Sequence, residues 1–156
     1  KFGPKGRLLA PQSGAMGYGV PAAIAAKLHD PSRFVLCFAG DGDFQMNGTE
    51  LGTALQAGLN PVILIINNSS YGTIRMHQER HYPHRVSGTA IVNPDYLAIA
   101  GAYGFHGERV TRTEEFMAAY DRACAATNGA IVEIVTSTEA ISPRTTISAL
   151  REAAGE

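Results

Sequence analysis

Two short polar segments of the sequence combine glycines with side chains that carry oxygen. Residues 40–43 read Gly-Asp-Gly-Asp, and residues 67–72 read Asn-Asn-Ser-Ser-Tyr-Gly. Glycines let the backbone approach a ligand closely and leave N–H groups free for phosphate oxygens. Asp41 and Asn68 offer hard oxygen ligands, which suit Mg²⁺ or Ca²⁺ and are poor for zinc. Because one carboxylate and one amide carry little charge, such an ion would also bind substrate phosphates and water. These residues therefore predict a metal-bridged diphosphate.

Apolar runs before each polar segment predict the strands that would position them. Residues 34–39, 62–66 and 131–135 are short and rich in β-branched side chains, which is typical of parallel strands covered by helices. Residues 47–58 predict a helix between the first two strands, and Asn47 with Glu50 resembles a capping box. This strand–helix–strand unit would bring both polar segments to the carboxyl ends of neighbouring strands, where open α/β sheets bind ligands.

The rest of the pattern predicts more units of the same kind. A loop from residue 14 leads into an alanine-rich helix that ends at 29, before Pro31. Asn93-Pro94-Asp95 predicts a helix with proline at its first position, running to about residues 101–104. A strand at 105–110 and a helix from 111–115 to 128–129 follow. We therefore predict one α/β domain over residues 1–156, with an open, doubly wound, mainly parallel sheet and helices on both faces. Residues 69–92 are expected to form a long functional loop.

Composition and charge exclude several classes of partner. The 156 residues carry 13 basic and 14 acidic side chains, so the net charge is −1 and gives no electrostatic reason to expect nucleic acid or an acidic membrane. No apolar run approaches the roughly 18 residues of a membrane span. Cys37 and Cys124 are interpreted as reduced core residues, and no secretory leader is visible, so a cytoplasmic location is expected.

The spacing of the two polar segments resembles a known signature. Gly40-Asp41-Gly42, then 24 residues, then Asn67-Asn68 is similar to the pattern of thiamine-diphosphate-dependent enzymes. Residues 14–23 (Gly-Ala-Met-Gly-Tyr-Gly-Val-Pro-Ala-Ala) resemble the segment that clamps the cofactor in the same enzymes. The resemblance covers essentially the whole chain, as the C-terminal pyrophosphate-binding domain of the acetolactate synthase, benzoylformate decarboxylase and pyruvate oxidase group. It implies thiamine diphosphate and Mg²⁺ as cofactors, and decarboxylation or carboligation of a small 2-oxo acid.

The resemblance also implies a role for each matching residue. The ligands of Mg²⁺ would be two side chains and one main-chain carbonyl, those of Asp41, Asn68 and Ser70. Backbone N–H groups facing the diphosphate would be those of Gly42, Asp43, Tyr71 and Gly72. The Gly14 carbonyl would accept a hydrogen bond from the 4′-amino group of the cofactor. The Met16 N–H would meet the pyrimidine ring, and its side chain would bend the cofactor into a V shape.

A substrate pocket is implied next to the metal loop, at Thr73, Ile74 and His77. Biosynthetic acetolactate synthases carry tryptophan at the position of His77, and this chain has no tryptophan, so the 2-oxo acid is left open. The family's catalytic glutamate, which protonates the pyrimidine N1′, lies in a separate pyrimidine-binding domain that no segment here resembles. The chain would thus form half of an active site in a homo- or hetero-oligomer and would be inactive alone.

Several of these residues also have simpler, purely structural interpretations. Met16 could be ordinary core filling. Glu50 is interpreted as a capping residue and not a catalyst, and Glu133 as paired at a sheet edge or an interface. His77, His81 and His84 have helical spacing that could suggest a zinc site, but Pro83 and the neighbouring arginines oppose it. Arg75 and His77 could instead meet a substrate carboxylate or be solvated surface.

Two other functions compete with the cofactor-binding half-site. One is a non-catalytic module that binds the cofactor or only dimerises, which the sequence leaves open. The other is a Rossmann-type dinucleotide binder, but the glycines at 14, 17 and 19 have the wrong order and follow a loop, not a strand.

Overall fold

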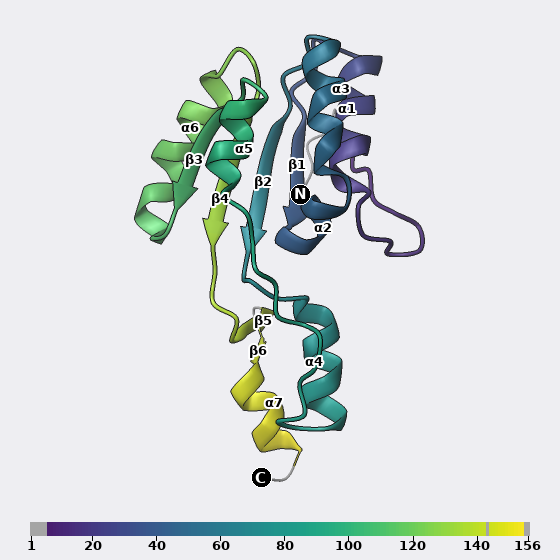
Figure 1. Cartoon of the computed structure of the whole chain (residues 1–156), viewed down its shortest axis with the longest axis vertical. Coiled ribbons are helices and arrows are strands. Elements are labelled where there is room, and N and C mark those ends of the chain that lie inside the picture. The colour runs from purple at the N-terminus through teal and green to yellow at the C-terminus, as the bar shows by residue number, and fades with distance from the viewer. Residues whose placement is uncertain (1–5, 143, 155–156) are drawn as a thin grey trace.

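Four parallel strands form the main sheet of the computed structural model, which describes residues 6–142 and 144–154 (Figure 1). The spatial order is β1-β2-β4-β3, and all three neighbouring pairs are parallel. The strands are β1 (Leu36–Gly40), β2 (Val62–Asn67), β3 (His106–Val110) and β4 (Ala130–Val135). Each lies within two residues of its predicted bounds, and the predicted open, parallel α/β sheet is confirmed. The carboxyl ends of β1 and β2 are therefore neighbours.

Helices cover both faces of this sheet, as predicted. One face packs against α1 (Gly19–His29), α2 (Asp41–Asn47), α3 (Leu51–Gln56) and α5 (Tyr96–Ala102). The other face packs against α6 (Phe116–Ala125). Alternating residues of β2 enter the two cores, with Ile63 in the first and Val62 in the second. On β1, Phe38 is 67% exposed, so α6 leaves this end of the second face open.

The crossover between β1 and β2 differs from the single predicted helix. Helix α2 begins at Asp41, directly after β1, and a 3₁₀ turn (η1, Gly48–Glu50) separates it from α3. The predicted capping box is wrong, because the Asn47 amide donates to the Gly17 carbonyl at 2.7 Å and the Glu50 carboxylate accepts from the Thr53 hydroxyl at 2.7 Å. Acidic residues in the first turn favour the earlier start, since they face the positive end of the helix.

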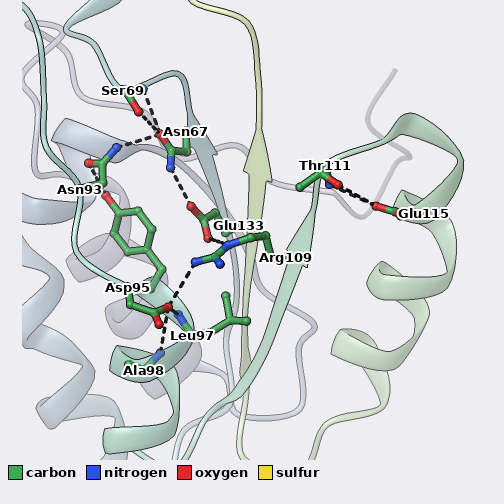
Figure 2. Close-up of polar contacts among 11 residues, drawn as sticks. Asn67, Ser69, Asn93, Asp95, Leu97, Ala98, Arg109, Thr111, Glu115 and Glu133 are labelled. Carbon is green, nitrogen blue, oxygen red and sulfur yellow. Dashed lines mark hydrogen bonds and ion pairs between the residues drawn. The ribbon is translucent and has the colours of Figure 1, made fainter.

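The two helices after residue 90 also begin at residues other than those predicted. Pro94 is not the first residue of α5, because Asp95 caps it and accepts from the Leu97 N–H at 3.0 Å. The predicted opening at 111–115 is a 3₁₀ turn (η2, Thr113–Glu115), in which the Glu115 carboxylate accepts from the Thr111 N–H at 3.2 Å (Figure 2). The α6 helix then ends at Ala125, three residues before the predicted stop.

A smaller group of elements lies beyond the carboxyl ends of β2 and β4 (Figure 1). It contains α4 (Gly72–His81), β5 (Ala140–Ser142), β6 (Thr145–Thr146) and α7 (Ile147–Ala153). The long functional loop predicted over residues 69–92 is therefore wrong as to structure, because residues 72–81 are helical, whereas its functional role stays a prediction. Helix α4 is joined to α7 by the fully buried Glu79, whose carboxylate accepts from Arg151 at 2.6 Å and 3.0 Å. Because Arg151 is 72 residues from Glu79 in the sequence, no pattern within residues 69–92 predicts this pair.

Hydrogen bonding by Arg151 lowers the pKa of Glu79, so the pair stabilises the fold when Glu79 is ionised. Its contribution is present above the unfolded pKa of about 4.5 and is lost as the pH falls through the lower folded pKa. Arg75 lies 3.7 Å from the same carboxylate, so the pair is part of a small buried network.

We expect Arg151→Ala to lower the free energy of unfolding by about 3 kcal/mol, because it leaves a buried carboxylate short of its main cation. Urea denaturation at pH 7 measures this. The matched control is Arg112→Ala, whose side chain is 66% exposed and pairs with Glu115 at the surface, with an expected loss below about 1 kcal/mol. Equal losses for the two variants would show that α7 is not held by Glu79.

The two cysteines differ in burial, so the expectation that both are core residues is confirmed for Cys37 and wrong for Cys124. Cys37 is buried and free, and burial raises the pKa of its thiol to about 12. Cys124 is exposed, so its assignment to the core is wrong.

Among the described residues, no helix is both long and apolar enough to cross a membrane.

Candidate functional site

A cavity of about 310 Å³ opens at the carboxyl ends of β1 and β2. All three predicted metal ligands line it: Asp41, Asn68 and Ser70. All four predicted diphosphate-facing residues line it too: Gly42, Asp43, Tyr71 and Gly72. Met16, Thr73 and Ile74 complete the predicted set in the lining, whereas Gly14 and His77 are not among the lining residues. The fold thus brings ten of the twelve predicted residues to one cavity.

Asp41 carries a buried carboxylate that accepts hydrogen bonds from neutral groups. Its side chain is on the first residue of α2, and the residue is 2% exposed. One oxygen accepts from the Gly42 N–H at 3.0 Å and the other from the Asn93 amide at 2.8 Å. No lysine, arginine or histidine within 6–142 and 144–154 forms an ion pair with it. Buried charges are normally paired or bound to metals, so this carboxylate fits a cation in the adjacent cavity.

The loop after β2 presents Asn68 and Ser70 to the same cavity. The Asn68 side-chain oxygen accepts from the Ser70 N–H at 3.0 Å, and Ser69 between them has φ of +53°. An isolated bridge to Ala90 and a hydrogen bond from the Ser70 hydroxyl to the Thr89 carbonyl, at 3.1 Å, hold the loop. An amide oxygen keeps a second lone pair, so this turn leaves Asn68 able to bind an ion.

The predicted backbone donors are not equally available. The N–H groups of Asp43 and Gly72 lie in the first turns of α2 and α4, where helices leave their N–H groups without internal partners. The Tyr71 N–H, in contrast, donates to the Thr89 carbonyl at 2.8 Å, and the Gly42 N–H donates to the Asp41 carboxylate at 3.0 Å. Both donors are therefore engaged within the chain, and their role toward the diphosphate stays a prediction. The Tyr71 ring lies against Gly42, where any Cβ would overlap it. Gly42 is therefore required by close packing.

Asp43 and Asn47 fix the loop that carries Met16. The Asp43 carboxylate accepts from the Gly17 N–H, and the Asn47 amide donates to the Gly17 carbonyl. Gly17 has φ of +82°, and a Cβ there would lie 2.7 Å from the Asn47 amide nitrogen, so only glycine fits. Met16 is 41% exposed and lines the cavity, which does not favour its interpretation as core filling.

The implied substrate residues separate along α4. Thr73, Ile74 and Arg75 line the cavity, while His77, one turn further, is exposed and outside the lining. Within the described ranges, no group of three His, Cys, Asp or Glu side chains could hold a metal. The Asp41, Asn68 and Ser70 set falls outside that class, because only one of its ligands is a carboxylate.

The structure adds residues that the sequence analysis missed. Four cavity residues come from the segment after β4, where no motif marked them: Thr138, Ala140, Ile141 and Ile147. A second group is polar and includes Asn67, Asn93 and Glu133, which Figure 2 shows together. It reaches Asp41 through the Asn93 amide, which donates to the Asp41 carboxylate at 2.8 Å. Glu133 is on β4, between β2 and β3, so its predicted place at a sheet edge is wrong. It is paired, as predicted, and its partners are Asn67 and Arg109 on the neighbouring strands.

Comparisons with known proteins agree with this geometry. The family model described as "Thiamine pyrophosphate enzyme, C-terminal TPP binding domain" matches residues 1–134. The large subunit of acetolactate synthase isozyme 2 from Escherichia coli is 40% identical over 109 residues, 69% of this chain and 20% of that protein. The mitochondrial acetolactate synthase catalytic subunit of Saccharomyces cerevisiae is 45% identical over 102 residues, 65% of this chain and 15% of that protein. The acetolactate synthase large subunit of Cyanidium caldarium is 38% identical over 127 residues, 80% of this chain and 22% of that protein. The chain thus spans about a fifth of the length of these relatives.

Proposed function

The chain belongs to the thiamine pyrophosphate enzyme family, as a C-terminal TPP binding domain, and from this premise we propose that its cavity holds the Mg²⁺-bound diphosphate of thiamine diphosphate. The observation that carries the proposal is the buried Asp41 carboxylate beside Asn68 and Ser70, which pairs with no cationic side chain in the described part of the chain. Mg²⁺ suits such a set, because it prefers oxygen ligands and keeps positions for phosphate oxygens and water.

Each part of the lining has a task in this proposal. Asp41, Asn68 and Ser70 hold the metal ion, and the N–H groups at the starts of α2 and α4 donate to diphosphate oxygens. Tyr71 and Ile74 shield these contacts from water, which strengthens them. Met16 supports the organic part of the cofactor from the loop fixed by Asp43. The bound cofactor supplies the carbon nucleophile and the electron sink that decarboxylation of a 2-oxo acid requires.

We propose further that the chain forms half of an active site. The relatives of which it spans about a fifth are named acetolactate synthases, so we assign its assembly to a decarboxylation or carboligation of a small 2-oxo acid. The other half would be a pyrimidine-binding domain or subunit that supplies a glutamate. We call this chain together with that domain or subunit, in a homo- or hetero-oligomer, the assembled enzyme.

Calorimetry of the chain tests the proposed function directly. We expect thiamine diphosphate and Mg²⁺ to bind together and hardly separately, because the diphosphate completes the ligands of the ion and the ion neutralises the diphosphate. Titrations of thiamine diphosphate with Mg²⁺, or with excess EDTA, separate the two cases. Tight cofactor binding in EDTA, or no binding with Mg²⁺ at millimolar cofactor, contradicts the proposal.

Replacing Met16 by alanine tests the cofactor-bending role that the resemblance implies. In the assembled enzyme, turnover should fall about tenfold or more, since the reacting groups lose their alignment. Cofactor affinity should change less than about twofold, because the contacts with the diphosphate remain. Met117→Ala is the control, since Met117 is 61% exposed on α6 and distant from the cavity lining. Weakened cofactor binding with unchanged turnover would make Met16 a packing residue.

A further inference from the structure

The Asn93 side chain is the junction of the polar network beside the cavity. Its amide nitrogen donates to the Asp41 carboxylate and to the Asn67 side-chain oxygen, each at 2.8 Å. Its amide oxygen accepts from the Tyr96 hydroxyl at 2.9 Å and from the Gln45 amide at 2.8 Å. Both N–H bonds and both lone pairs are thus used, so only one orientation of the amide satisfies all four partners.

A closed circuit of side chains holds Asn93 in this orientation (Figure 2). The Asn67 amide donates to Glu133 at 2.7 Å, and the other oxygen of Glu133 accepts from Arg109 at 2.6 Å. Arg109 also donates to Asp95 at 3.2 Å, and Asp95 caps α5 only two residues after Asn93. The circuit therefore returns to the segment where it began, and it joins the ends of β1 and β2 to β4 and the edge strand β3.

We propose that Asn93 is a positioning residue that holds the Asp41 carboxylate in the orientation for binding the metal ion; this inference rests on the function proposed above. Asn93 itself does not line the cavity, so it acts only through Asp41 and Asn67. Each carboxylate oxygen of Asp41 uses one lone pair, towards Asn93 or Gly42, and keeps another for an ion. The donors thus fix the carboxylate plane without blocking it.

Asn93 preorganises the Asp41 carboxylate for binding the ion. A carboxylate with a single donor can rotate about its side-chain bonds, and that freedom is lost when the ion binds. With Asn93 in place, the rotation is already restricted in the metal-free chain. Loss of a group that orients a metal ligand typically costs about 10- to 100-fold in metal affinity.

Metal affinity of Asn93 variants in the assembled enzyme tests this inference. Asn93→Leu keeps the approximate size of the side chain and removes every donor and acceptor. We expect the Mn²⁺ affinity, measured by electron paramagnetic resonance at saturating thiamine diphosphate, to fall at least about tenfold. The control is Asn60→Leu, which removes a surface hydrogen bond to the Thr127 carbonyl and should leave the affinity unchanged.

Tyr96→Phe keeps the inference testable if Asn93→Leu does not fold. It retains the ring that packs edge-on against Phe44 and removes only the hydroxyl, which lies 2.9 Å from the Asn93 amide oxygen and 3.3 Å from the Asp41 carbonyl oxygen. We expect an intermediate loss of Mn²⁺ affinity, about threefold, with the spectrum of the bound ion altered in both variants. Unaltered affinity and spectrum in a folded variant that is merely less stable to heat would overturn the positioning role. If the unmodified enzyme itself binds no metal with thiamine diphosphate, the proposed function fails instead.

Discussion

Asp41→Ala is expected to abolish retention of thiamine diphosphate by the assembled enzyme. The substitution removes the only carboxylate among the three proposed metal ligands, and so most of the charge that attracts Mg²⁺. The loss of affinity should exceed the roughly 100-fold upper range for groups that merely orient a ligand. Gel filtration followed by assay of the bound cofactor, at fixed free Mg²⁺, measures retention.

The stability of the metal-free chain separates a lost site from a damaged fold. Asp41→Ala removes two hydrogen bonds, but it also removes a buried charge that has no cation among the described residues. These effects offset each other, so we expect the free energy of unfolding to fall by no more than about 1 kcal/mol. Asp30→Ala, whose side chain is 38% exposed and pairs with Arg33, is the matched control and should retain the cofactor. Cofactor retention by Asp41→Ala would remove Asp41 from the metal site.

The strands and the cavity could be predicted because their signals are local. Apolar runs mark β2 and β4, the second interrupted by Glu133, and the crossover between β1 and β2 sets the distance between Asp41 and Asn68 in the sequence. Once the sheet is parallel, its geometry brings those two residues to one edge without further information. Because the polar segments that follow β1 and β2 meet at this edge, ten of the twelve predicted residues line one cavity.

Interactions between distant segments could not be predicted. Helix α4 depends on the pair between Glu79 and Arg151, and its own residues lack the apolar periodicity that marks a buried helix. Asn93 looked like a helix start because Pro94 and Asp95 follow it. The structure uses its amide for Asp41 and Asn67 instead, and the cap moves to Asp95.

The sequence predicts that Glu133 is paired, but it does not predict its partners. A single carboxylate within an apolar strand predicts a paired partner, since an unpaired buried charge is costly. Which partner it meets depends on the strand order, and that order places β4 beside both Asn67 and Arg109. The same order makes Arg109, on an edge strand, part of the network that reaches Asp41 through Asn93.

The chain alone is expected to be catalytically inactive, which is the largest effect we predict. With Mg²⁺, thiamine diphosphate and pyruvate or benzoylformate, it should release no CO₂ above the cofactor-only background. The resemblance implies a glutamate at N1′ of the pyrimidine, and the carboxylates in the described cavity lining belong to Asp41 and Asp43. The first is the proposed metal ligand, and the second accepts from the Gly17 N–H. Neither is placed to act as that acid.

Glu79 is the internal alternative, and its surroundings oppose the role. The carboxylate is fully buried, is paired with Arg151, and has a lowered pKa, so it holds no proton to donate at neutral pH. The assay should follow calorimetry showing that the chain is loaded with cofactor, so that inactivity reflects missing groups and not an empty site. Adding a partner that supplies the glutamate should then start CO₂ release. Cofactor-dependent release by the loaded chain alone would contradict the half-site. Glu79→Gln would then test whether Glu79 is the acid, because an amide keeps the shape of the side chain and cannot transfer the proton.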